Sequence, residues 1–89
     1  MELSPRVVAV EPLPDMELRL RFADGSEGLV RLAERLRPLR GMTLPLGDPD
    51  FFRQVTIDHE AGTVTWPNGV DLDPDVLYAL AHGRNLTDR

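Results

Sequence analysis

Apolar and charged side chains alternate strictly over residues 16–22, and this alternation constrains the fold of the chain more than any other feature. Successive side chains of a β-strand point to opposite faces, so the alternation predicts a strand with one buried face and one wet face. Asp24 and Gly25 follow and favour a tight turn, after which residues 26–32 provide a partner strand. We therefore predict a hairpin with Gly25 in the left-handed conformation.

Charge indicates the register of this hairpin. A three-residue loop places Arg21 opposite Glu27 and Glu17 opposite Arg31 on the wet face, with apolar residues opposite one another on the other face. A loop of two residues would mix the faces, because a shift of one residue moves every side chain to the opposite face. The three-residue loop is therefore the prediction.

A further strand is expected before the hairpin. Residues 6–11 are rich in β-branched side chains and end at the prolines of residues 12–14. This segment is apolar on both faces, so we expect both faces to be covered. After the hairpin, residues 33–37 favour a short helix that Pro38 limits, and residues 38–47 predict an irregular connection with apolar anchors.

The second half of the chain predicts a similar order of elements. Three more strands are expected at residues 55–58, 63–66 and 70–72. The loop between the first two places Ile57 opposite Val64, which makes one face of this second meander apolar. The third strand is expected to pair with the second across a Pro-Asn-Gly turn.

Two Asp-Pro-Asp sequences, at residues 48–50 and 73–75, each predict the start of a helix. Asp is favoured as the N-cap residue, and Pro is tolerated at the first helical position. The first helix is expected to be a single short turn. The second is expected to reach His82 and to end at Gly83.

Together these elements predict one α+β domain over residues 1–83. It consists of two three-stranded antiparallel meanders with short helices, in a βββα-βββα pseudo-repeat. Residues 84–89 are expected to be a flexible C-terminal tail. No apolar run is long enough to cross a membrane and no signal sequence is evident, so a cytoplasmic protein is expected.

Composition excludes several kinds of chemistry. The chain has no cysteine, which excludes disulfides, thiolate metal sites and cysteine nucleophiles, and it has no lysine. Ser26 has no base that the sequence places beside it, and no glycine-rich phosphate motif is present. We therefore expect neither an enzyme nor a cofactor. The net charge of −5 argues against general nucleic-acid binding, because phosphate neutralisation needs a basic surplus.

Two acidic clusters resemble metal sites in composition but do not match the pattern that a metal site requires. Asp71, Asp73 and Asp75 are spaced like the start of a calcium loop, but the glycine and glutamate that such a loop requires further along are missing. In residues 58–60 a histidine lies between two acids, although neighbours on one turn rarely converge on an ion. We expect helix capping at the first cluster, a solvated loop at the second, and no metal site.

Arginine side chains dominate the candidate interaction surface. They lie on the wet hairpin face and along residues 31–40, and a planar guanidinium suits a protein partner's carboxylates. Glu17 and Glu27 neutralise the hairpin face, which disfavours nucleic acid there. Neighbouring helical residues point in different directions, so one phenylalanine of residues 51–52 can be exposed, whereas Trp66 is expected in the core. The candidate surface residues are Arg19, Arg21, Arg31, Arg35, Arg37, Phe51 and Phe52.

Four segments together resemble a known family. They are Pro-Arg-Val-Val-Ala-Val-Glu-Pro-Leu-Pro-Asp from residue 5, Leu-Arg-Phe-Ala-Asp-Gly-Ser-Glu-Gly from residue 20, Asp-Pro-Asp-Phe-Phe-Arg-Gln-Val from residue 48, and Val-Thr-Trp-Pro-Asn-Gly-Val-Asp-Leu-Asp-Pro-Asp-Val-Leu-Tyr from residue 64. This set resembles the bacterial family called domain of unknown function 2442. The last segment is the most specific of the four.

The resemblance implies a small α+β domain with no assigned enzymatic activity. Some relatives carry a helix-turn-helix after this domain, but the six residues after Gly83 are too few for that element. Other relatives are encoded beside a second small protein, in pairs that resemble toxin–antitoxin operons. We therefore expect a non-catalytic protein-interaction or regulatory module, either an antitoxin-like partner of a neighbouring small protein or a homodimer. The alternative is a nucleic-acid-binding regulator that uses the arginine-bearing strand face.

Overall fold

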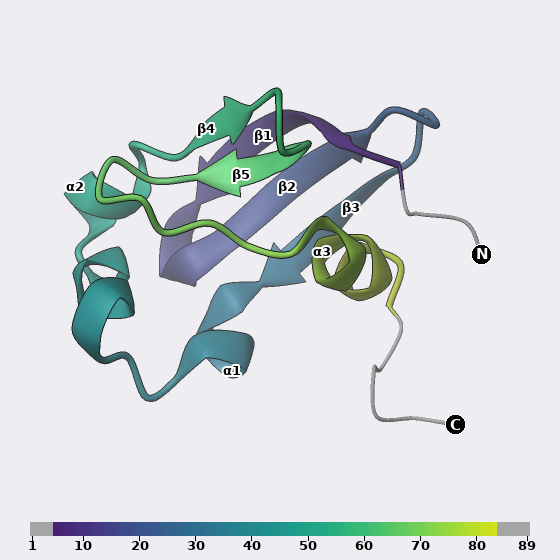
Figure 1. Ribbon diagram of the computed structural model, residues 1–89. Coiled ribbons are helices and arrows are strands. Elements are labelled where there is room, and N and C mark those ends of the chain that lie inside the picture. Colours follow the sequence, from purple (N-terminus) through teal and green to yellow (C-terminus); the bar gives the residue numbers. More distant parts are fainter. Residues whose placement is uncertain (1–4, 84–89) are drawn as a thin grey trace.

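The computed structural model describes residues 5–83, so the tail expected at residues 84–89 lies outside the described residues. Strands β1, β2 and β3 form a three-stranded antiparallel sheet, and β4 and β5 form a two-stranded sheet (Figure 1). This is a small α+β domain, as expected. In chain order the elements, with 3₁₀-helices named η, are β1 (Val7–Leu13), η1 (Pro14–Met16), β2 (Glu17–Phe22), β3 (Glu27–Arg31), α1 (Leu32–Leu36), η2 (Gly41–Gly47), α2 (Pro49–Phe52), β4 (Thr56–Asp58), β5 (Thr63–Thr65) and α3 (Pro74–Ala81).

The hairpin of β2 and β3 has the predicted register. Arg21 lies opposite Glu27, and Glu17 lies opposite Arg31. Gly25 has a φ of +88°, so it occupies the left-handed conformation that the turn requires. The requirement that opposite charges face one another on the wet side therefore predicted this part of the fold correctly.

Strand β1 lies at one edge of the sheet and is less regular than its sequence indicates. The register with β2 shifts between Val7 and Ala9, which places a β-bulge at Val8. Val7 is buried but Val8 is 43% exposed, so the expectation that both faces of this strand are covered is wrong. Pro12, which has no N–H to donate, lies in this edge strand, where proline is tolerated.

The second half of the chain does not form the three-stranded meander that its sequence predicts. Strands β4 and β5 pair with Ile57 opposite Val64, as predicted. The expected strand at residues 70–72 is wrong, because it contributes only an isolated bridge between Thr65 and Asp71. The pseudo-repeat is therefore incomplete, with three strands in its first half and two in its second.

Threonine hydroxyls help to hold residues 70–72 against β5. Thr65 donates a hydrogen bond to the carbonyl oxygen of Val70 at 2.9 Å, and Thr63 donates one to the carbonyl oxygen of Leu72. The Trp66 backbone N–H also donates to the Val70 carbonyl oxygen at 2.9 Å, so the segment follows β5 through side-chain bonds and this limited backbone pairing, without forming a third strand.

Both predicted helix starts are present. The Asp48 side chain accepts a hydrogen bond from the Asp50 N–H at 2.9 Å, and Asp73 accepts one from the Asp75 N–H at 2.8 Å. Gly83, which follows the C-cap residue His82 of α3, has a φ of +74°, as its position predicts. By contrast, part of the connection expected to be irregular is the 3₁₀-helix η2.

The core lies between the inner face of the three-stranded sheet and a second layer, which contains α3 and the β4–β5 hairpin (Figure 1). Trp66 is buried, as predicted, and its indole N–H donates to the carbonyl oxygen of Phe52 at 3.0 Å. Helix α3 packs closely on β3 at Gly28, where a Cβ atom would collide with the carbonyl group of Ala81. The side chains that are fully buried are Val7, Leu18, Leu20, Phe22, Val30, Leu32, Leu46, Val64 and Leu77.

Candidate functional site

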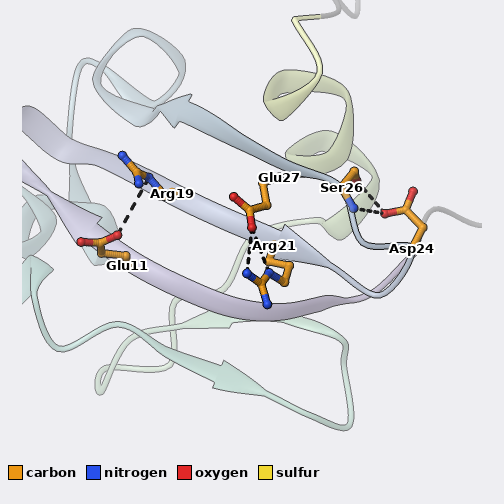
Figure 2. Close-up of polar contacts among 6 residues, drawn as sticks. All are labelled: Glu11, Arg19, Arg21, Asp24, Ser26 and Glu27. Atoms are coloured by element: carbon orange, nitrogen blue, oxygen red, sulfur yellow. Dashed lines mark hydrogen bonds and ion pairs between the residues drawn. The ribbon is translucent and has the colours of Figure 1, made fainter.

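The outer face of the three-stranded sheet carries arginine and glutamate side chains in pairs. Arg21 Nη2 lies 2.8 Å from Glu27 Oε2, and its Nε also donates to this oxygen at 3.1 Å. Arg19 Nε lies 3.9 Å from Glu11 Oε1. Figure 2 shows the two pairs side by side on the sheet.

Arg31 completes this arrangement from β3. Its Nε lies 3.6 Å from Glu17 Oε2, and its Nη1 lies 3.8 Å from Glu34 Oε2. Each arginine on this face therefore has a carboxylate partner, which leaves no surplus of positive charge for a phosphate backbone. We call this surface the sheet face, and it consists of Glu11, Glu17, Arg19, Arg21, Glu27 and Arg31.

Three more arginines lie on α1 and in the connection after it. Arg35, Arg37 and Arg40 are exposed, and none of them has an acidic partner within residues 5–83. Unpaired guanidinium groups remain available to the carboxylates of another molecule.

Two large apolar side chains of η2, which follow these arginines in the sequence, are exposed to solvent. Met42 is 59% exposed and Leu44 is 61% exposed, whereas Leu46 is fully buried and anchors the segment in the core. We call this second region the η2 surface, and it consists of Arg35, Arg37, Arg40, Met42 and Leu44.

Hydrogen bonds fix the backbone of the η2 surface. Asn68 Nδ2 donates to the carbonyl oxygen of Met42 at 2.9 Å, across a separation of 26 residues. The Thr43 hydroxyl donates to the carbonyl oxygen of Arg40 at 2.9 Å and accepts from the Arg40 N–H at 3.1 Å. The exposed side chains are therefore presented on an ordered segment.

The two candidate phenylalanines lie closer to the core than a contact surface requires. Phe52 is 3% exposed, so it is a core residue and its assignment to the interaction surface is wrong. Phe51 is half-buried and packs against the core. Helix α2 therefore leaves neither ring fully exposed.

Asp24 connects the β2–β3 turn to α3. It accepts hydrogen bonds from the Ser26 hydroxyl at 2.6 Å and the Ser26 N–H at 2.9 Å, while its other oxygen accepts from the Tyr78 hydroxyl at 2.7 Å. The Ser26 contacts appear in Figure 2. These bonds, the Ser26 hydroxyl first, lower the pKa of Asp24 from 3.8 to about 2 because they stabilise its charged form. The local sequence carries no sign of the Tyr78 contact, which spans 54 residues.

The acidic clusters serve the backbone. Asp58 accepts from the N–H groups of Glu60 and Ala61 at 3.1 Å each, and so caps the loop that contains His59. In the part of the chain that the structure describes, no three histidine, aspartate or glutamate side chains are grouped to hold a metal ion. None of the described helices is long and apolar enough to span a membrane.

The geometry defines a small α+β domain with one charge-paired face and one face with unpaired arginines. The chain belongs to the family described as protein of unknown function DUF2442, whose model matches residues 7–83. This confirms the resemblance drawn from the four sequence segments. No curated protein and no solved structure gives a significant match to the chain.

Proposed function

We propose that this protein is a non-catalytic protein-binding module that contacts its partner through the η2 surface. The observation that carries the proposal is the exposure of Met42 and Leu44, at 59% and 61%, on a backbone that Asn68 holds in place. Burying apolar surface stabilises a complex by about 25 cal/mol per Å². Arginine and methionine, which together provide four of the five residues of this surface, are enriched in protein interfaces.

The charge of the η2 surface indicates the chemistry of the partner. Arg35, Arg37 and Arg40 lack acidic partners within residues 5–83, so a complementary surface has an apolar centre and a carboxylate rim. A second copy of the chain fits poorly, because a two-fold contact brings the same patch of both copies together and would oppose like charges. A different small protein, as in an antitoxin-like pair, is therefore the favoured partner.

Co-expression with the product of the adjacent gene, followed by pull-down, tests this proposal. We expect the partner to co-purify with the natural chain, and the double variant Met42→Ala, Leu44→Ala to lose it. The matched control is Val8→Ala, Leu29→Ala, which removes two apolar side chains that are 43% and 48% exposed away from the η2 surface. Loss of the partner in the control but not in the η2 variant would refute the proposal.

A nucleic-acid-binding regulator acting through the sheet face is the alternative, and it has less support. Arg19, Arg21 and Arg31 are each engaged by glutamate, so phosphate binding would first have to break these ion pairs. A mobility-shift assay at low salt tests this alternative, because phosphate contacts are strongest there. We expect no shift, and a shift that Arg19→Gln, Arg21→Gln abolishes would favour the alternative.

A further inference from the structure

A cleft of about 400 Å³ lies where β1 passes into β2. Its walls come from η1, α1, η2 and α2 and from the segments that join them. Figure 1 shows α2 at this end of the fold, away from α3. The volume is within the range of about 300–1,000 Å³ that is typical of small-molecule sites.

The floor of the cleft is apolar and preformed. Met16, Leu46 and Phe52 line it and are 8%, 0% and 3% exposed. Phe52 packs against Trp66 with ring centroids 5.6 Å apart, and its carbonyl oxygen accepts the indole N–H. These side chains support the cleft from beneath, and its accessible apolar surface comes from the less buried lining residues Pro12, Leu13, Ala33 and Pro49.

Backbone strain lies in one wall of the cleft. Asp15 and Met16 have φ values of +65° and +60°, in the left-handed region that residues other than glycine rarely adopt. Such conformations persist where the surrounding structure imposes them, and they are concentrated at binding sites. Here they place Met16 in the floor of the cleft and Asp15 at its rim.

The rim carries the charges that select a ligand. Arg37, Arg53 and Asp15 all line the cleft. Arg53 is already paired with Asp50, whereas Arg37 has no acidic partner in the described chain. With Asp15 contributing a negative charge nearby, the rim suits a ligand with a single negative charge better than a phosphate dianion.

We propose that this cleft binds a small carboxylic acid with an apolar body, such as a medium-chain alkanoate. The apolar body would lie against Pro12, Leu13, Ala33 and Pro49, and the carboxylate would pair with the Arg37 guanidinium. Arg37 belongs both to this cleft and to the η2 surface, but the cleft proposal concerns the isolated chain and is tested without a protein partner.

Titration of the full chain with hexanoate, followed by ¹H–¹⁵N NMR, tests the proposal. We expect chemical-shift changes at the residues that line the cleft, with a Kd on the order of 1 mM for a ligand of this size. Hexylamine and hexanol, which share the apolar body but lack the carboxylate, should bind at least about tenfold more weakly, because a charge-assisted bond is lost.

Two variants locate the site. Arg37→Gln should weaken hexanoate binding by about tenfold, whereas Arg35→Gln, two residues earlier in α1 and outside the cleft, should leave it unchanged. Ala33→Phe places a ring in the cleft and should abolish binding while Arg37 is retained. The dispersion of the amide spectrum establishes that each variant is folded.

Three results would overturn the proposal. They are no shifts at 10-fold the expected Kd (about 10 mM), equal binding of hexanoate and hexylamine, and equal effects of the Arg35 and Arg37 substitutions. None of these results depends on partner capture, so failure of the cleft proposal and failure of the proposed function can be told apart.

Discussion

The sheet face and the η2 surface each expose three arginines, yet they differ in what surrounds them. On the sheet face each arginine has a side-chain nitrogen within 3.9 Å of a glutamate oxygen. On the η2 surface none of the three has an acidic partner among the residues that the structure describes. The comparison shows that the two surfaces differ in the pairing of their arginines rather than in the number of arginines.

The difference arises from secondary structure. Opposite residues of an antiparallel pair are held side by side, so a glutamate on one strand meets the arginine across from it, as Arg21 meets Glu27. A short helix and the turn after it impose no such partners. Glu34 is the acid nearest in sequence to Arg35, and it lies on Arg31 instead.

The largest expected effect comes from removing the buried support of the η2 surface. Leu46→Ala should lower the free energy of unfolding by about 2–5 kcal/mol, because Leu46 is fully buried and its truncation leaves a cavity. Leu29→Ala, a change of the same chemistry at a position that is 48% exposed, should change it by less than about 0.5 kcal/mol. Urea unfolding measures both changes in free energy. Similar losses for the two variants would contradict the conclusion that Leu46 is a buried anchor and Leu29 a surface residue.

A smaller effect is expected from the hydrogen bond that fixes η2. Asn68→Asp removes the donor to the Met42 carbonyl oxygen but keeps an acceptor for the Val70 N–H. We expect a loss of about 0.5–1.5 kcal/mol in unfolding free energy. Amide hydrogen exchange should accelerate in η2 and remain unchanged in β2. Acceleration spread evenly over the chain would show that Asn68 does not act locally.

Charge pairing itself should contribute less. A double-mutant cycle with Arg21→Gln and Glu27→Gln should give a coupling free energy of about 0.2–1 kcal/mol, because both side chains are at least half exposed. High salt should reduce this coupling, whereas Arg37→Gln should leave unfolding unchanged at any salt concentration. A large effect of Arg37→Gln on stability would mean that the η2 arginines are not free.

Low pH should weaken the hydrogen bond by which Asp24, in the β2–β3 turn, contacts Tyr78 of α3. The pKa of Asp24 is lowered from 3.8 to about 2, so its stabilising effect is complete above pH 3.8 and is lost as pH falls towards 2. Carboxyl NMR titration should place the Asp24 midpoint near 2, and Tyr78→Phe should raise it. A midpoint near 3.8 in the natural chain would indicate that the hydrogen bonds of Asp24 do not persist in solution.

Local patterns predicted the parts of the fold that local physics determines. Strict alternation and charge predicted the β2–β3 register, and the two Asp-Pro-Asp sequences predicted the starts of α2 and α3. The missing third strand of the second half depends on which group satisfies the carbonyl groups of residues 70–72. Threonine hydroxyls and the Trp66 backbone N–H fulfil that role, and the sequence pattern of a strand does not distinguish this arrangement from a regular ladder.

The candidate site was less accessible to prediction, for a related reason. Its arginines are evident from the sequence, but their pairing depends on contacts across strands. The burial of Phe52 depends on Trp66, which lies 14 residues away, and the fixed backbone of η2 depends on Asn68. These are tertiary contacts that no periodic pattern records.

Gly28 allows α3 to pack directly against β3. A side chain at this position would collide with the Ala81 carbonyl group, so the helix either rests directly on the strand or is displaced from it. Displacement would also draw Tyr78 away from Asp24 and so separate the first hairpin from the last helix. The absence of a Cβ atom at Gly28 thus sets the distance between β3 and α3 at this point.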